Sequence, residues 1–255
     1  MYKENEYFSP EILVSIGSYT FSKYVTLNLK LDIDKNFDFA IIKFSEKILD
    51  EILINKDDEV IIQLGYNNEL EKVFTGYVTD VKDFEIVAKN KFLNLINTNI
   101  NKSFTNATFD EILKFILNQA NIQDMVIKSD ITVIKNLISI KNKNGLDSIK
   151  YLEQKFNIKE SLYFFKNDKF LYNDKEKQQE SYELIYGNNI LNLQNLCPKV
   201  WEVETISMPK LNLLDNIYIE HYKLTGTFKV EKINFIVNDY GFIRTKITIR
   251  EWFYE

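Results

Sequence analysis

Apolar and polar residues alternate with a period of two along most of the first hundred residues. The clearest case is 25–33, where every second residue from Val25 to Ile33 is Val, Leu or Ile. This period buries one face of a β-strand and leaves the other toward solvent. Ser45 is expected to cap a helix, because apolar residues follow it at helical spacing. Residues 1–100 therefore predict a compact β-barrel or sandwich with one helix.

Helical spacing takes over after residue 100. Thr108 and Glu111 form a capping-box pattern, and apolar residues form one stripe over the next three turns. A second helix is expected to begin at Asn144 as N-cap. Residues 161–172 alternate on both sides of a two-residue turn, which is typical of a hairpin. The middle block, 101–192, is therefore expected to be an α+β domain.

Residues 193–255 return to the strand pattern. The apolar spacing shifts by one between Val230 and Ile233, which predicts a β-bulge. The last strand is expected at 244–250, with Ile247 and Ile249 facing inward. The expected fold class is α+β with β dominating, in which the first and last blocks are similar β units that flank the middle domain.

Two segments in these outer blocks follow the same pattern. In the first, an acidic turn at Asp58 precedes an alternating strand, and Thr75-Gly76 opens the next strand. In the second, Asp215 and Thr225-Gly226 take the same places. A chain that builds one small β unit twice is expected to present two similar surfaces. That is a requirement of assembly rather than of catalysis.

Charge and cysteine content exclude several classes of protein. The net charge is −5, and residues 1–100 carry 11 Lys against 17 Asp and Glu, so no global basic surface for nucleic acid is expected. A single cysteine excludes an intramolecular disulfide and a cysteine-based zinc site. The polar N-terminus lacks the apolar core of a Sec signal, and no run approaches the roughly 18 apolar residues that would span a bilayer.

Candidate chemistry gives no catalytic, cofactor or metal site. His221 is the single histidine and is expected to be an ordinary rim residue; Cys197 precedes Pro198 without a nucleophile context and is expected to be buried. The carboxylates at 57–59 and 80–85 lie beside strand ends, where they commonly form turns. The chain is therefore not expected to be an enzyme or to bind a cofactor.

The segment from Asp58 to Tyr66, followed by Val73 to Val81, resembles the first barrel of baseplate hub proteins of contractile phage tails and phage tail-like particles, the late control protein D-like family. The order of the middle elements is also similar, as are 211–217 and 223–230 in the place of a second barrel. The family often has Gly-Asp where this chain has Asp57-Asp58 and Leu214-Asp215. This departure leaves the turn types at both places open.

The resemblance implies two similar small β-barrels, at 1–100 and 193–255, and a definite role. Three hub copies would form a ring of near six-fold character that joins a trimeric spike to a hexameric tail tube. The implied partners are two further copies, the spike, the tail tube protein, other baseplate proteins and, as a further candidate, the tape measure protein. No membrane or stable nucleic-acid binding is implied. Outward residues of the last strand are candidate interface contacts, with a solvated strand face as the equal alternative: Arg244, Lys246 and Arg250.

Two other functions stay open at this stage. One is a cell-wall-degrading or glycan-binding tail protein, for which 255 residues leave no room beside two barrels and a middle domain. The other is a spike-side adaptor of a secretion-like injection system. The protein is expected to be made in the bacterial cytoplasm and incorporated in the baseplate of a phage, a tailocin or another bacteriocin-like particle. The sequence does not distinguish among these particles.

Overall fold

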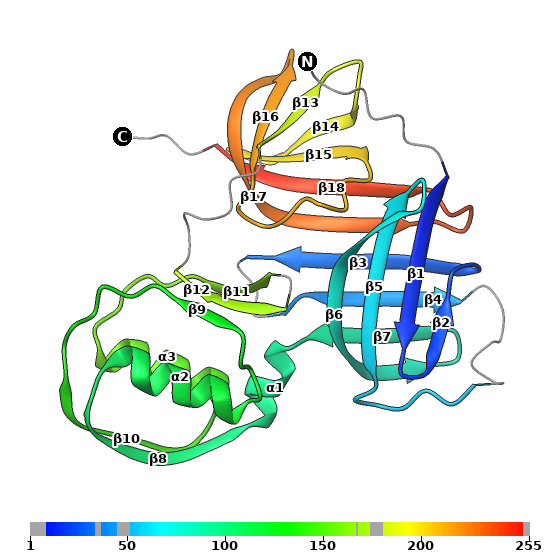
Figure 1. The fold of residues 1–255 in the computed structure, drawn as a ribbon. Coiled ribbons are helices and arrows are strands. Elements are labelled where there is room, and N and C mark those ends of the chain that lie inside the picture. The colour runs from blue at the N-terminus through cyan, green and yellow to red at the C-terminus, as the bar shows by residue number, and fades with distance from the viewer. Residues whose placement is uncertain (1–8, 34–36, 45–51, 167, 174–180, 252–255) are drawn as a thin grey trace. The chain divides into compact units, whose positions relative to one another are not determined.

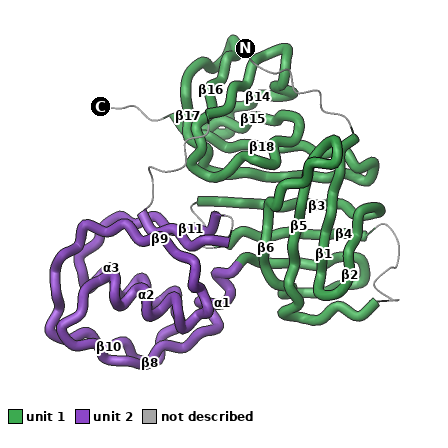
Figure 2. The backbone as a smooth tube through the Cα atoms, in the orientation of Figure 1, with its two compact units in different colours: residues 1–90, 178–255 green, residues 91–177 purple. Residues whose placement is uncertain are grey.

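The computed structural model describes residues 9–33, 37–44, 52–166, 168–173 and 181–251. Its chain forms two compact units (Figures 1 and 2): unit 1 consists of Met1–Asn90 with Gln178–Glu255, and unit 2 of Lys91–Lys177. The two ends of the chain thus belong to one unit. The helix expected after Ser45 begins in 45–51, outside the described residues. The domain limits at 100 and 192 remain a proposal.

The described residues of unit 1 form a sheet of 13 strands. The strands before unit 2 are β1 (Pro10–Ile16), β2 (Tyr19–Phe21), β3 (Val25–Asp32), β4 (Phe39–Phe44), β5 (Glu59–Tyr66), β6 (Glu69–Lys82) and β7 (Glu85–Asn90). Those after it are β13 (Ser181–Ile185), β14 (Ile190–Cys197), β15 (Val200–Ile206), β16 (Asn216–His221), β17 (Leu224–Val237) and β18 (Ile243–Arg250). The α+β, β-dominated class expected from the sequence is confirmed.

The same strand order occurs twice in this sheet. The first set is β3-β4-β7-β6-β5 and the second is β14-β15-β18-β17-β16. In both sets, five strands that are consecutive along the chain pair in the spatial order first, second, fifth, fourth, third. We call these sets the first and second β repeat. The duplication inferred from sequence is therefore a duplication of topology.

The turns that launch the third strand of each repeat are alike atom by atom. Oδ2 of Asp58 accepts the backbone N–H of Asn55 at 2.8 Å, and Oδ2 of Asp215 accepts that of Asn212 at 2.8 Å. The preceding residue has a positive φ in both turns, 70° at position 57 and 67° at position 214. Glycine adopts such a φ without strain. The two turns therefore share one geometry, although neither has the glycine that the resembling family often carries.

Backbone hydrogen bonds align the two repeats beyond the turns. The backbone N–H of Val78 donates to the carbonyl of Asp58, as that of Val230 donates to the carbonyl of Asp215. A bulge follows at once in both, between Val78 and Asp80 and between Val230 and Lys232. The second is the bulge expected from the sequence, which is confirmed.

The Thr-Gly pairs, by contrast, are not equivalent. Gly76 pairs with Val60, two residues after Asp58, whereas Gly226 pairs with Ile219, four residues after Asp215. Under the alignment given by the turns, Gly76 corresponds to Phe228. The expectation that Thr75-Gly76 and Thr225-Gly226 take the same places is therefore wrong. The two Thr-Gly pairs are alike in sequence but lie at different positions of the β repeat.

In the part of unit 2 that the structure describes, three helices pack against two small sheets. Its helices are α1 (Phe92–Asn97), α2 (Phe109–Gln119) and α3 (Gly145–Lys155). Its strands are β8 (Asn99–Ala107), β9 (Met125–Ile127), β10 (Lys135–Asn144), β11 (Tyr163–Lys166) and β12 (Lys169–Tyr172). Helices α2 and α3 and the β11–β12 hairpin confirm the expectations from spacing. Helix α1 and the β8–β10 pair were not predicted, because their apolar positions do not follow a clear period.

Thr108 begins α2 through the expected capping box. Its Oγ1 accepts the backbone N–H of Glu111 at 3.3 Å, and the Glu111 carboxylate accepts the backbone N–H of Thr108 at 2.8 Å. Thr108→Ala is expected to lower the free energy of unfolding of unit 2 by about 1 kcal/mol, because it removes an N-cap acceptor. Urea unfolding followed by circular dichroism measures this, with the exposed Lys114→Ala on the same helix as control. Equal stability of the two variants would contradict the prediction.

Candidate functional site

β3 and β17 join the two β repeats into one sheet. They pair antiparallel from Lys232 opposite Asp32 to Val237 opposite Leu27, and Figure 1 shows them side by side. We call residues 27–32 and 232–237 the junction. On its core side Leu29 lies opposite Phe235, and their exposed fractions are 0% and 1%. Two segments about 200 residues apart in sequence therefore share one apolar core.

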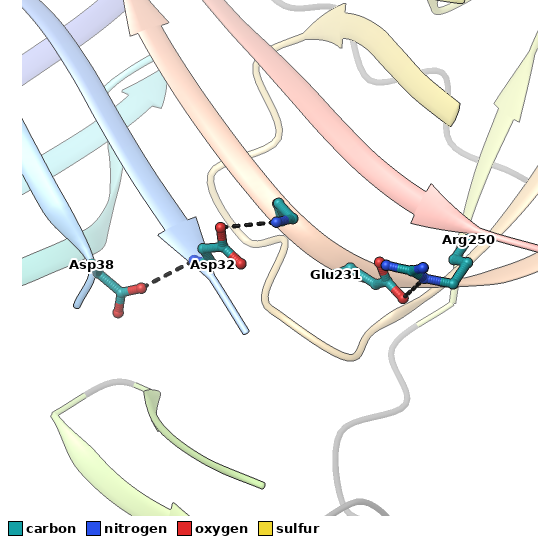
Figure 3. Close-up of polar contacts among 5 residues, drawn as sticks. Asp32, Asp38, Glu231 and Arg250 are labelled. Carbon is teal, nitrogen blue, oxygen red and sulfur yellow. Dashed lines mark hydrogen bonds and ion pairs between the residues drawn. The ribbon is translucent and has the colours of Figure 1, made fainter. Parts of the chain in front are cut away.

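Ion pairs close one end of the junction (Figure 3). Nζ of Lys232 lies 3.0 Å from Oδ2 of Asp32, and Nε of Arg250 lies 2.9 Å from Oε1 of Glu231. The backbone carbonyl of Glu231 also accepts the N–H of Ile33 at 3.1 Å. The pair between Lys232 and Asp32 thus links the two β repeats directly, and the Glu231 side chain is buried beside it.

Asp38 is buried at the same end of the junction. Its Oδ1 accepts the backbone N–H of Asp32 at 3.2 Å, and its Oδ2 accepts Nδ2 of Asn90 at 2.8 Å. Burial raises the pKa of Asp38 to about 7; these two hydrogen bonds counter that rise in part, and the charge of Asp32 adds to it. A carboxyl group with a pKa raised to near neutral is therefore buried beside Asp32 at the end of β3.

The interface candidates from the sequence all lie on β18, and each of them has a partner within the chain. Nη1 of Arg244 donates to the carbonyl of Ile243 at 3.0 Å. Nζ of Lys246 lies 3.7 Å from carboxylate oxygens of both Glu202 and Glu204. Arg250 binds Glu231, as described above. Because β18 pairs with β15 and β17, it offers no open edge. An interface role for these three residues remains a prediction.

Ile247 and Ile249 face the core with no exposed surface, as the period of two predicts. Both repeats place a lysine opposite a glutamate at one equivalent pair of positions, but the strand that carries the lysine differs. Lys43 lies opposite Glu85 in the first repeat, and Glu204 opposite Lys246 in the second. The first pair is 3.1 Å apart. The face that carries these side chains is therefore polar and of mixed charge in both repeats.

His221 is packed as a structural residue. It is buried, its ring stacks on Tyr222 with centroids 4.2 Å apart, and its Nδ1 accepts the backbone N–H of Lys223 at 3.1 Å. Burial, with a smaller contribution from the charge of Lys223, lowers the pKa of His221. The sequence predicted that His221 would be an ordinary rim residue, whereas the structure places its side chain in a buried position.

Cys197 does not lie where the sequence reasoning placed it. The side chain is exposed at the end of β14, so the expectation of a buried cysteine is wrong. The physical reason is that β14 is the last strand of the sheet, with β15 as its one partner among the described strands. Residues at a sheet edge lose the cover that a second neighbour would give.

Two acidic residues singled out in the sequence have structural partners. Asp58 holds the turn before β5, and Asp80 is in a surface ion pair with Lys82 at 3.4 Å. Within the ranges that the structure describes, no group of three or more His, Cys, Asp and Glu side chains is placed to hold a metal ion. No helix among those residues is long and apolar enough to cross a membrane.

Comparison with solved structures identifies the fold. A 43 kDa tail protein of prophage MuSo2 from Shewanella oneidensis matches with a TM-score of 0.71 at 13% identity, over 94% of this chain and 97% of that one. A tail protein from Neisseria meningitidis matches with a TM-score of 0.71 at 8% identity, over 96% and 97%. No protein-family model matches the sequence, and no curated protein matches it either.

A third structure comes from a secretion system. The Escherichia coli c3393 protein, a component of the type VI secretion system with structural similarity to the T4 bacteriophage tail proteins gp27 and gp5, matches with a TM-score of 0.69 at 12% identity, over 94% of this chain and 76% of that one. The resemblance to tail proteins that the strand patterns suggested is thus confirmed at the level of the fold. This chain has the fold of phage tail proteins and of a related secretion-system component.

Proposed function

We propose that this protein is a structural, non-enzymatic hub of a contractile-tail baseplate. Three copies form a ring of pseudo-six-fold symmetry that joins a trimeric spike to a hexameric tail tube. The ring is part of a phage tail or of a tailocin, and its further partners are other baseplate proteins and the tape measure protein. The protein is made in the cytoplasm and acts in the assembled baseplate.

The observation that carries this proposal is the double β repeat with its junction. Two copies of one topology lie in one sheet, and they are related head to tail because β17 of the second meets β3 of the first. Head-to-tail contacts generate rings when the rotation closes. Two repeats in each of three chains supply six similar units, which is the number a hexameric tube requires. The fold shared with tail proteins supports the same role.

The full-length protein is expected to form trimers, alone or with its spike, because each chain supplies two of six equivalent positions. Native mass spectrometry of the purified protein measures the number of copies in the complex. Cryo-EM of the particle shows whether the protein lies where the tail tube meets the spike. A strict monomer that is absent from that place would overturn the proposal.

Incubation with purified peptidoglycan separates the hub from a cell-wall-degrading tail protein. We expect no release of soluble fragments, because Asp58 and Asp215 hold turns and Asp80 is in an ion pair with Lys82. Release by the wild-type protein would refute the non-enzymatic role. A muramidase assayed in parallel shows that the substrate preparation can be cleaved.

A further inference from the structure

Exposed aromatic side chains lie beyond one end of the junction. The turn that follows β17 holds Tyr240, which is 86% exposed, and Phe242, which is 52% exposed. Leu27, near the start of β3, pairs with Val237 at the end of β17. Tyr24 directly precedes β3 and is 64% exposed. Aromatic residues from both sides of the junction are therefore open to solvent at the same end.

Phe84 extends this group across the sheet. It lies in the turn between β6 and β7 and is exposed. Its backbone carbonyl accepts the N–H of Phe44 at 3.0 Å, and Phe44 pairs with Val25, the first residue of β3. Phe84 thus lies at the same end of the strands as Tyr24. We call four exposed side chains at this end of the sheet the aromatic end: Tyr24, Phe84, Tyr240 and Phe242.

Hydrogen bonds brace the turn that carries Tyr240 and Phe242. Oδ1 of Asn238 accepts the backbone N–H of Tyr240 at 3.1 Å and that of Phe242 at 3.0 Å. The backbone N–H of Gly241 donates to the carbonyl of Asn238 at 2.9 Å. The guanidinium carbon of Arg244 lies 5.9 Å from the centroid of the Phe242 ring. A braced turn loses less conformational entropy when a partner covers its side chains.

The opposite end of the same strands differs in chemistry. It carries the ion pair between Lys232 and Asp32 and the buried Asp38, so these charged groups have partners within the chain. β7 ends there at Asn90, the last residue before unit 2. The aromatic end instead exposes several large apolar side chains close together, which is typical of an interaction site.

The two ends also differ in how often they occur in the proposed ring. Strands that pair side by side around a closed ring run along its axis with a tilt, so their two ends belong to its two faces. Both β repeats contribute to the aromatic end, through Tyr24 and Phe84 in the first and through Tyr240 and Phe242 in the second. Three chains therefore supply six contributions to that face. Unit 2 occurs once per chain and is supplied three times.

The six contributions are of two alternating kinds. The hairpin of β17 and β18 is longer than that of β6 and β7 by three residue pairs beyond the equivalent pairs Asn234–Lys246 and Lys82–Glu85. The face is therefore six-fold in the number of its hairpins and three-fold in their length. A six-fold partner finds a hairpin below each of its subunits, whereas a three-fold partner would leave half of the hairpins uncovered.

We propose that the aromatic end binds the end of the hexameric tail tube, through an apolar surface on the tube. This assignment rests on the proposed hub function and adds to it which end of the sheet meets the tube. Tyr240 and Phe242 are the main contacts, because they are exposed on a braced turn. Aromatic side chains that become fully covered commonly supply most of the binding energy of an interface.

Photo-crosslinking in assembled particles tests this assignment. Tyr240 is replaced by the photoreactive p-benzoyl-phenylalanine in the bacterium that makes the particles, and the purified particles are irradiated. Mass spectrometry is expected to find position 240 linked to the protein that forms the tube. The same amino acid in place of Lys199, an exposed residue at the opposite end of the sheet, is the control and is expected to give no link to the tube protein.

A double variant tests whether the aromatic side chains carry the contact. Tyr240→Ser with Phe242→Ser is expected to leave the trimer intact by native mass spectrometry, because both positions are exposed. Electron microscopy should show about tenfold fewer baseplates that bear a tube, because two aromatic contacts are lost from each chain. Tyr222→Ser, another exposed tyrosine in the turn before β17, is the matched control and should assemble as the wild type does.

The outcomes separate this assignment from the proposed function. A link from position 240 to the spike or to a second copy of this chain overturns the assignment and leaves the hub proposal standing. A protein that lies where the tube meets the spike, but gives no link from position 240 to the tube protein, does the same, as does a double variant with normal tubes. A monomer that is absent from the particles overturns both. The link to the tube protein, with loss of tubes in the double variant, supports both.

Discussion

Phe235→Ala is expected to lower the free energy of unfolding of unit 1 by about 3–5 kcal/mol. The ring is fully covered at the junction, and its removal leaves a cavity between β17 and β3 that the paired backbones cannot close. Because the junction joins the two β repeats, the loss of stability is expected in both repeats. Hydrogen exchange should report lower protection in β3 as well as in β17 and β18.

The exposed Thr227→Ala on the same strand is the control for Phe235→Ala, with an expected change within about 0.5 kcal/mol. A double-mutant cycle with Leu29→Ala should give a coupling of about 0.5–3 kcal/mol, since the two side chains lie opposite each other. Lower protection confined to β17, with β3 unchanged, would show that the two repeats do not share one cooperative core.

Asp38→Asn is expected to stabilise unit 1 more at pH 8 than at pH 5. Burial raises the pKa of Asp38 to about 7, whereas an aspartate in the unfolded chain titrates near about 3.9. The folded state therefore binds the proton more tightly. The contribution of Asp38 is fully present below about pH 4 and is lost as the pH rises through about 7.

The expected size of this effect follows from the two pKa values. Each unit of difference corresponds to about 1.4 kcal/mol, so the variant should exceed the wild type at pH 8 by on the order of 2–4 kcal/mol. Urea unfolding at both pH values measures the difference, and the exposed Asp83→Asn is the control. A gain of equal size at pH 5 and pH 8 would contradict a raised pKa as the cause.

The ion pair between Lys232 and Asp32 must be intact in that comparison. Asp32 lies beside Asp38, and its charge contributes to the raised pKa. Its own partner, Lys232, belongs to the other β repeat. A variant that removed Asp32 would change both the pKa of Asp38 and the contact across the junction, so it cannot serve as a control for either.

Local spacing determined the elements in which one face is buried. The alternation in 25–33 and 244–250 marks β3 and β18, because burial on one face of a strand forces a period of two. The capping box at Thr108 and the N-cap at Asn144 marked α2 and α3 for a similar reason, since helix ends need acceptors for their first N–H groups. Such signals lie within a few residues of one another and can be read from the chain alone.

Spacing also revealed the repeat, but it did not align its two copies. The Thr-Gly pairs suggested one correspondence, while the hydrogen bonds of Asp58 and Asp215 establish another that differs by two residues. A period of two fixes the face of each side chain, and a shift by two leaves every face unchanged. Sequence pattern is therefore blind to this particular error.

The sequence by itself determined the β-rich class, helices α2 and α3 of unit 2 and the presence of a duplicated β unit. Tertiary structure alone decided that β3 meets β17, that Asp38 is buried beside Asp32 at the end of β3 and that Cys197 is exposed at an edge. The physical reason is that hydrogen bonds between strands are formed by the backbone, which is the same in every residue. The side chains of a strand state which face is buried, and only the folded chain shows which strand lies beside it.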